Sequence, residues 1–316
     1  MSLLVVDNLQ VDFDLKVGVL TAVNNVSLEL EEGETRGIVG ESGSGKTVTA
    51  LAIMGLLESP ASVRKGSIRY RGRELTTLSE SGWEKIRGRN ISMVFQEPMT
   101  SLNPVITIGR QIAEVYYHHL GLTMKEGLRR AAVMLERVKL PDAKRLLNKY
   151  PYELSGGMRQ RVMIAAALAC RPDILIADEP TTALDVTVQS QILNLLRDIQ
   201  DEMKVGLLFI SHNLGVIAQL CSRVAVMYAA EIVEEGLTRD VFGSPRHPYT
   251  VGLMASIPRR GRELKSIRGS ICDLANPPAG CRFHPRCPST RPLCREAAPA
   301  LVQTGNTRVA CHFPEQ

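Results

Sequence analysis

The chain has 316 residues, enough for one large α/β domain and a smaller appendage, and its 44% hydrophobic and 22% charged residues exclude a disordered or fibrous protein. We find no run of about 20 apolar residues and no secretion signal, so we expect a cytosolic protein that works at a membrane only by docking. The net charge of +5 is concentrated in residues 259–316, where ten Lys/Arg face four Asp/Glu.

In chain order, the first segments alternate apolar and polar residues as β-strands do, and a glycine-rich loop and a helix follow. The predicted strands cover 3–6, 9–15, 22–30, 68–70, 174–177 and 207–211, and helical spacing covers 47–57 and much of 104–150. The last two strands are wholly apolar, which is typical of a buried parallel sheet. Periodicity fades after Phe242, so we predict one domain over 1–241 and a C-terminal extension over 242–316.

The segment from Gly40 to Thr47 reads GESGSGKT and matches the phosphate-loop pattern G-x-x-x-x-G-K-S/T in full. It lies between a predicted strand and a predicted helix, which is the context that this motif requires. Backbone N–H groups of such a loop point at one phosphate, and the helix N-terminus adds positive charge. The residues expected to contact a nucleotide are Gly40, Ser42, Gly43, Ser44, Gly45, Lys46 and Thr47. Lys46 should reach the β- and γ-phosphates, and the Thr47 hydroxyl should ligate Mg²⁺.

The apolar strand at 174–177 ends in two carboxylates, Asp178 and Glu179. Ligands bind at the C-terminal edge of parallel strands, so both carboxylates are expected near the nucleotide. We expect Asp178 to hold Mg²⁺, directly or through water, and Glu179 to act as the general base that orients the attacking water.

Residues Leu154–Arg161 read LSGGMRQR, and this run resembles the signature motif of ATP-binding-cassette (ABC) proteins. A serine and two glycines before a helix again suit phosphate binding. Other family elements occur in the expected order. Gln96 resembles the Q-loop glutamine, Asp185 in Ala183-Leu184-Asp185 resembles the D-loop, and His212 resembles the switch histidine.

The resemblance implies a P-loop NTPase of the ABC type, an α/β fold with an N-terminal antiparallel β subdomain, an inserted helical subdomain at about 97–157, and a small irregular C-terminal extension. It implies that two subunits close head to tail around two ATP molecules. Gln96 would sense Mg²⁺ and the γ-phosphate, and His212 would contact the γ-phosphate. The partner-facing nucleotide contacts would come from Ser155, Gly156, Gly157 and Asp185.

One position departs from the family pattern. ABC subunits usually place an aromatic residue before the phosphate loop to stack on adenine, and this chain has Val17 there, with Phe13 nearby. We expect Val17 to give adenine only an apolar contact.

Longer strings resemble the ATP-binding subunits of oligopeptide, dipeptide and nickel importers. These strings are FQEPMTSLNP at 95–104, ADEPTTALDVTVQ at 177–189, PRHPYT at 245–250 and GCRFHPRCP at 280–288. That resemblance implies a second ATPase subunit, favoured to be a paralogue, two transmembrane permease subunits and an extracytoplasmic solute-binding protein. It places the chain at the cytoplasmic face of the inner membrane, with 97–115 against a permease helix.

The cysteines are clustered in the extension, where Cys281, Cys287, Cys294 and Cys311 have the spacing C-x5-C-x6-C-x16-C. Four cysteines in a Pro- and Arg-rich segment suggest a metal site, and they suit a 4Fe–4S cluster, which the importer resemblance also implies. Zinc and free thiols stay open as alternatives, although zinc sites usually have closer cysteine pairs. The nearby Arg282, Arg286 and Arg295 could offset the negative charge of a cluster.

Two classes of function fit these motifs. The favoured one is the ATPase motor of an importer for peptides or a related small solute, without nucleic-acid binding. The alternative is a soluble ABC ATPase that acts on nucleic acid or ribosomes. Such proteins usually carry two cassettes or a long coiled-coil insertion, and this chain shows one cassette and no such insertion.

Overall fold

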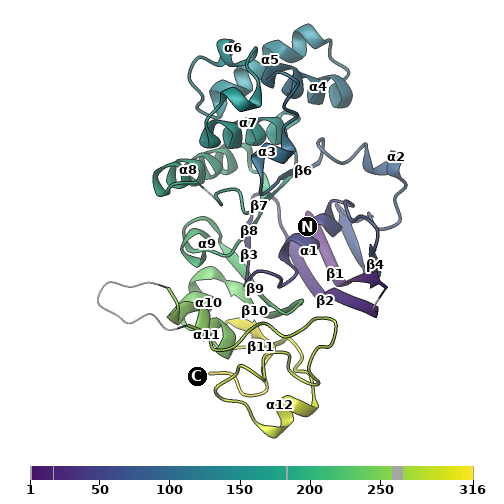
Figure 1. The fold of residues 1–316 in the computed structure, drawn as a ribbon, viewed down its shortest axis with the longest axis vertical. Coiled ribbons are helices and arrows are strands. Elements are labelled where there is room, and N and C mark those ends of the chain that lie inside the picture. The colour runs from purple at the N-terminus through teal and green to yellow at the C-terminus, as the bar shows by residue number, and fades with distance from the viewer. Residues whose placement is uncertain (1, 17, 183, 258–265, 316) are drawn as a thin grey trace. The chain divides into compact units, whose positions relative to one another are not determined.

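A computed structural model describes residues 2–16, 18–182, 184–257 and 266–315 (Figure 1). The chain forms two compact units. The first unit contains Met1–Leu30, Thr35–Thr76 and Phe209–Gln316, and the second contains Glu31–Glu34 and Thr77–Leu208. Across the described residues, no helix is both long and apolar enough to cross a membrane.

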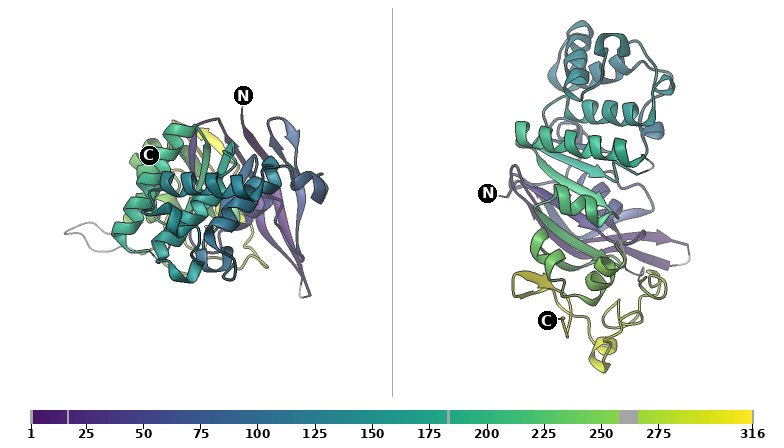
Figure 2. Two further views of the ribbon diagram at one scale, coloured as in Figure 1. Left: turned by 90° about the horizontal axis from the view of Figure 1, so that it is seen from above. Right: turned by 90° about the vertical axis from the view of Figure 1, so that its left-hand side faces the viewer.

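The first unit begins with an antiparallel sheet. Its strands, in the order β2-β1-β4-β5, are β2 (Gly18–Leu30), β1 (Leu4–Leu15), β4 (Ala61–Tyr70) and β5 (Arg73–Glu74). The long strands β1 and β2 lie side by side in both views of Figure 2. Leu4, Val6, Leu9 and Val11 are buried along β1, so the predicted alternation has one face in a core. The predicted N-terminal antiparallel β subdomain is confirmed.

The nucleotide motif belongs to a second sheet of the same unit. The strands of this sheet in the first unit include β3 (Thr35–Val39), β9 (Arg223–Tyr228) and β10 (Glu231–Leu237). The same unit contains the helices α1 (Lys46–Ile53) and α9 (Leu214–Leu220). Strand β3 pairs in parallel with β9, and all five of its residues are buried. The predicted helix over 47–57 is shorter, because Met54 caps it and Gly55 has a φ of 62°. Strand β8 (Gly206–Ser211) contains residues of both units.

The C-terminal segment continues this sheet instead of forming a wholly irregular tail. Its elements are α10 (Thr238–Gly243), α11 (Pro248–Ala255), α12 (Pro292–Glu296), β11 (Val302–Thr304) and β12 (Thr307–Val309). Strand β12 pairs antiparallel with β10, with Val309 opposite Glu234. Between residues 266 and 291 the chain forms turns and bends, as the yellow ribbon of Figure 1 shows. The proposed division into 1–241 and 242–316 stays a prediction.

The second unit contains a parallel strand pair and a group of helices. The strands β6 (Ile91–Val94) and β7 (Ile174–Asp178) pair in parallel, and both are buried throughout. The helices are α2 (Glu80–Trp83), α3 (Pro98–Ser101), α4 (Ile108–Leu120), α5 (Met124–Arg137), α6 (Ala143–Leu146), η1 (Pro151–Glu153), α7 (Gly156–Leu168) and α8 (Val186–Met203). The helical spacing seen over 104–150 is thus divided among separate helices, one of which ends at Gly121 with a φ of 65°.

Candidate functional site

The phosphate loop lies in the first unit between β3 and α1. A Cβ atom at Gly40 would lie 2.2 Å from the Met227 carbonyl oxygen, and one at Gly45 would lie 2.4 Å from that of Ala22. Only glycine fits at either position without moving backbone. Gly45 also has a φ of 99° as the N-cap of α1. The close approach of neighbouring strands therefore dictates two of the glycines that the sequence motif contains.

The loop residues differ in their exposure. Ser44 is fully buried and the side chain of Lys46 is only 5% exposed, whereas Ser42, Gly43 and Thr47 are exposed. The Lys46 ammonium folds over the loop and donates to the carbonyl oxygens of Gly40 and Glu41, both at 2.9 Å. The Thr47 hydroxyl, predicted to ligate Mg²⁺, thus lies on the surface at the first turn of a helix. Val17, the predicted adenine contact, lies outside the described residues.

The predicted switch histidine also belongs to the first unit. His212 is exposed and follows the end of β8, directly before Asn213, the N-cap of α9. The Asn213 side chain accepts hydrogen bonds from Gly215 N at 3.0 Å and Val216 N at 3.4 Å. This cap begins the helix at once, so His212 stays in the short connection at the strand end.

The second unit brings two of the predicted catalytic residues into contact. Asp178 ends β7 and is only 2% exposed. Glu179 follows it with a φ of 45°, in the left-handed region that a residue other than glycine rarely adopts. The Glu179 Oε2 atom accepts hydrogen bonds from Gln96 Nε2 at 3.2 Å and from the Thr182 hydroxyl at 2.9 Å. Two hydrogen bonds and a strained backbone therefore hold the carboxylate of the predicted general base.

The signature and D-loop residues form two adjacent helix N-termini in the same unit. Ser155 caps α7 by accepting from Met158 N at 3.3 Å, and Asp185 caps α8 by accepting from Val188 N at 2.9 Å. A Cβ atom at Gly157 would lie 2.6 Å from Val188 Cγ1, so the first turns of the two helices are packed closely. Exposed helix N-termini are ready sites for anions, and both belong to motifs predicted to face a nucleotide.

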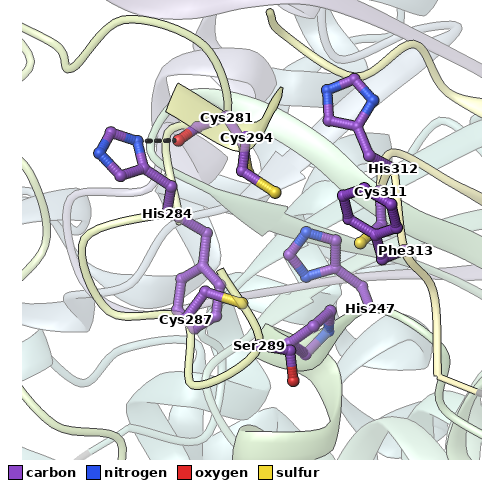
Figure 3. Close-up of a pocket in the computed structure, with 11 residues that line it drawn as sticks. His247, Cys281, His284, Cys287, Ser289, Cys294, Cys311, His312 and Phe313 are labelled. Atoms are coloured by element: carbon purple, nitrogen blue, oxygen red, sulfur yellow. Dashed lines mark hydrogen bonds between the residues drawn. The ribbon is translucent and has the colours of Figure 1, made fainter. Parts of the chain in front are cut away.

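The four clustered cysteines line one pocket of the first unit (Figure 3). The pocket is lined by Cys281, Cys287, Cys294, Cys311, His247, His284, His312, Pro248, Phe283, Ser289 and Phe313. Burial raises the pKa of the Cys281 thiol to about 11, and burial also raises the pKa of Cys287 and Cys311. Burial lowers the pKa of His247 to about 3, so this ring is neutral, and its Nδ1 atom accepts from Tyr249 N at 3.0 Å.

The predicted metal donors of this pocket are its four cysteine thiols. In the described part of the chain, no group of three or more His, Cys, Asp or Glu side chains is arranged to hold a metal ion. A 4Fe–4S cluster binds each of four thiolates to a different iron atom, so its sulfurs surround a space instead of converging on one point. Four cysteines around one pocket are consistent with that arrangement.

Comparisons with known proteins agree with the motifs. The family model described as ABC transporter matches residues 23–182, and the model described as Oligopeptide/dipeptide transporter, C-terminal region, matches residues 233–294. The oligopeptide transport ATP-binding protein OppD of Salmonella typhimurium is 47% identical over 99% of this chain and 94% of its own length. AppD of Bacillus subtilis, another oligopeptide transport ATP-binding protein, is 47% identical over 100% of this chain and 98% of its own.

The chain belongs to the ABC transporter family.

Solved ABC structures agree with the fold. The dimeric post-hydrolysis structure of the cassette MJ0796, bound to ADP and Pi, has a TM-score of 0.67 and 29% identity, covering 75% of this chain and 99% of that one. The cbiO1 protein of Clostridium perfringens, part of the ABC transporter complex cbiONQ, has a TM-score of 0.65 and 26% identity, covering 77% and 91%. The predicted P-loop NTPase fold of the ABC type is therefore confirmed, and this ABC subunit is an ATP-binding and hydrolysing protein.

Several contacts of this ABC subunit were not anticipated from its sequence. The cysteine-bearing segment reaches the phosphate loop, because Arg286 pairs with Glu41. Arg282 pairs with Glu231 at 3.0 Å. Each of the two arginines forms an ion pair with a carboxylate, and their expected role in offsetting the charge of a cluster stays a prediction. The strings PRHPYT and GCRFHPRCP resemble those of importer subunits and so drew attention to these segments. They did not indicate which distant carboxylates the arginines would pair with.

Proposed function

We propose that this chain is the ATP-hydrolysing subunit that powers import of peptides, or of a related small solute, through a multi-subunit ABC transporter. The observation that carries the proposal is the ordered set of phosphate loop, Q-loop, signature, acidic strand end, D-loop and switch histidine, in a chain that is similar over its whole length to oligopeptide transport ATP-binding proteins. The match of residues 233–294 to the oligopeptide/dipeptide C-terminal region supports the peptide class.

In the proposed mechanism, the phosphate loop and Lys46 bind the phosphates of ATP. Thr47, Gln96 and Asp178 would hold Mg²⁺, which supplies positive charge to the β- and γ-phosphates. Glu179 accepts a proton from water as the water oxygen bonds to the γ-phosphorus and the bond to the bridging oxygen of ADP breaks. The 3.2 Å contact from Gln96 to Glu179 supports a shared task, since it orients the carboxylate that receives the proton.

The proposed active form is a pair of ATPase subunits. Each ATP is held by one phosphate loop and by Ser155, Gly156, Gly157 and Asp185 of the other subunit. The packed N-termini of α7 and α8 support this role because they present donors and partial positive charge on one surface. We propose a paralogue as the second ATPase, with His212 contacting the γ-phosphate and Val17 giving adenine an apolar contact.

The proposed assembly includes two transmembrane permease subunits and an extracytoplasmic solute-binding protein, at the cytoplasmic face of the inner membrane. The test is an affinity pull-down of the full chain from gently solubilised native membranes, with the partners identified by mass spectrometry. We expect two permeases and a second ATPase. Recovery of ribosomal or nucleic-acid-binding proteins alone would overturn the importer and favour a soluble ABC ATPase.

We also propose that Cys281, Cys287, Cys294 and Cys311 bind a 4Fe–4S cluster. The support is that all four thiols line one pocket of the first unit. Anaerobic purification should give about four irons per chain and visible absorbance. A Cys287→Ser variant should lose both signals, whereas Cys170→Ser should keep them. Stoichiometric zinc, or no metal, would contradict the cluster.

A further inference from the structure

Arg286, which directly precedes the pocket residue Cys287, binds a residue of the phosphate loop. Its Nη1 atom donates to Glu41 Oε2 at 2.9 Å and its Nη2 atom donates to Glu41 Oε1 at 3.2 Å. The Arg286 side chain is only 6% exposed and that of Glu41 is 28% exposed. A bidentate pair with this burial is geometrically specific and stronger than an exposed ion pair.

The guanidinium is held from several sides. Arg286 Nε donates to the Arg268 carbonyl oxygen at 2.9 Å. The Arg286 Cζ atom lies 5.6 Å from the ring centroid of Tyr228 and 6.0 Å from that of Phe283. These contacts leave the side chain little freedom, so little rotamer entropy remains to be lost when it pairs with Glu41.

A second group of the C-terminal segment holds the backbone of the same residue. Glu41 N donates to the hydroxyl of Tyr249 at 2.9 Å, and Tyr249 is fully buried. The Tyr249 ring packs against Tyr228, with centroids 4.7 Å apart, and against Phe283 at 5.5 Å. Side chain and backbone of Glu41 are therefore both fastened to the segment that carries the cysteines.

Glu41 is in turn central to the shape of the phosphate loop. Its carbonyl oxygen accepts from Lys46 Nζ at 2.9 Å and from Ser44 N at 3.2 Å. Its carboxylate is negative and belongs to a loop that binds polyanionic phosphates, so without Arg286 it would repel the ligand. Arg286 thus has two effects on this loop, neutralisation and positioning.

The other arginine of the cysteine motif is linked to the loop through the two residues between β9 and β10. Arg282 directly follows Cys281 and donates from Nη1 to the Ala229 carbonyl oxygen at 2.6 Å. The next residue, Ala230, donates its N–H to the Ser44 carbonyl oxygen at 3.1 Å. Two residues that neighbour pocket cysteines are therefore linked to the loop by separate routes.

We propose that Arg286 is a positioning residue for ATP binding, through which the cysteine-bearing C-terminal segment holds the phosphate loop neutral and correctly curled. The segment then controls the affinity for ATP. This inference rests on the proposed ATPase function, and it assigns to Arg286 a role separate from hydrolysis itself.

The test measures Mg-ATP affinity by titration calorimetry on the full chain and on Arg286→Gln, and it measures KM and kcat for hydrolysis on each of them assembled with the second ATPase subunit. We expect the variant to lose about tenfold in ATP affinity and to raise KM in parallel, because a charge-assisted bidentate contact is lost and a carboxylate is exposed to phosphate. The kcat at saturating ATP should stay within about twofold, because the lost interaction stabilises bound ATP and the transition state for hydrolysis equally. Unchanged affinity in a folded Arg286→Gln would overturn the proposal.

A double variant separates electrostatics from general damage. Arg286→Gln combined with Glu41→Gln should recover much of the lost affinity, since the uncompensated negative charge is gone. If the double variant binds ATP no more tightly than Arg286→Gln alone, the neutralising role of Arg286 is contradicted. Arg295→Gln is the matched control, because Arg295 is an exposed arginine of the same segment, and no ion pair is found for it among the described residues. It should bind ATP as the unmodified chain does.

A milder variant covers the case in which Arg286→Gln does not fold. Tyr249→Phe removes only the hydroxyl that accepts from Glu41 N and keeps the buried ring. It should lower ATP affinity severalfold with unchanged kcat, and unchanged affinity would overturn the positioning role of the segment. If the unmodified chain neither binds nor hydrolyses Mg-ATP, the proposed function itself fails. If the unmodified chain is active and the variants bind ATP with unchanged affinity, only the role proposed for Arg286 and the C-terminal segment is refuted.

Discussion

At the scale of single residues, the predicted chemistry depends on a carboxylate that neighbouring groups hold in place. Glu179 adopts a φ of 45° and receives hydrogen bonds from Gln96 and Thr182. Such strain persists only where the surroundings over-determine the conformation, and it is concentrated at functional sites. The two hydrogen bonds and the fixed backbone explain how a flexible side chain is kept in one orientation at the end of β7.

Replacing Glu179 by glutamine should separate nucleotide binding from hydrolysis. Glutamine keeps the shape of the side chain but cannot accept the proton, so the hydrolysis rate should fall by about 100-fold or more. ATP should still bind, and size-exclusion chromatography of the variant together with its partner ATPase subunit and ATP should show a trapped pair. Asp201→Asn, at an exposed acid on α8, removes the same charge and should leave the rate unchanged. A steady-state ATPase rate that Glu179→Gln does not alter would refute the assignment.

At the scale of elements, the glycines of the signature motif are constrained by the close packing of the first turns of α7 and α8. Gly156 and Gly157 occupy the first positions of α7, yet their surroundings differ. A Cβ at Gly156 would have Leu184 Cδ2 at 3.7 Å, an ordinary contact, whereas one at Gly157 would lie 2.6 Å from Val188 Cγ1. The second glycine is therefore required by packing against α8 as well as by any ligand.

The two glycines provide a matched pair of alanine variants. Alanine is favoured over glycine in a helix by about 1 kcal/mol, so Gly156→Ala should be neutral or slightly stabilising. Gly157→Ala should be less stable than Gly156→Ala by about 1–3 kcal/mol, because the added methyl group forces Val188 to move. Thermal unfolding followed by circular dichroism would measure the difference. Equal melting temperatures would mean that the interface between α7 and α8 is looser than described.

The extended sheet of the first unit carries a second test at this scale. Glu235 on β10 is 5% exposed and pairs with Arg36 on β3, also 5% exposed, and with Arg308 on β12 at 2.6 Å. Arg36→Met should lower the free energy of unfolding by about 3 kcal/mol, because it leaves a buried carboxylate only partly compensated. Arg308 is 46% exposed, so Arg308→Met should cost less. Urea denaturation would measure the free energy of unfolding of both variants, and an equal decrease in the two would contradict this ranking.

At the scale of the whole molecule, the chain combines an ATPase cassette with a segment that has few apolar residues of its own. The cysteine segment is anchored by β12 pairing with β10 and by the buried Phe283 against Tyr228 and Tyr249. From 266 to 291 it has turns and bends but no helix or strand. A segment of this kind gains much of its stability from cross-links, and the proposed cluster would provide four of them.

Loss of the proposed cluster should therefore lower the stability of the C-terminal segment before that of the cassette. Iron chelation after air exposure should lower the melting temperature and open 266–315 to limited proteolysis, since the thiols would no longer be joined. Hydrogen exchange by mass spectrometry would localise the change, with β1 and β2 as internal references. The Cys287→Ser variant should show the same pattern without chelation. Unchanged protection after proven iron loss would rule out a structural role for the metal.

The sequence by itself determined the fold family and the order of the nucleotide motifs, because these depend on local patterns. Glycine spacing, apolar runs and the residues that end a strand are properties of neighbours in the chain, and they predicted the loop at Gly40–Thr47 and the acidic end of β7. Local patterns also placed the cysteines in one short segment. They did not foresee the break of the helix after Ile53, which a cap and a left-handed glycine cause.

Only the tertiary structure decided which distant residues meet. The pairing of Arg286 with Glu41 joins positions 245 residues apart, and the Tyr249 hydroxyl reaches Glu41 N across 208 residues. The addition of β11 and β12 to the sheet likewise has no local signature, because an edge strand is defined by the backbone that it pairs with. Long-range pairs of this kind come from the packing of the folded chain. The contacts between the phosphate loop and the C-terminal segment could therefore not be predicted from local sequence patterns.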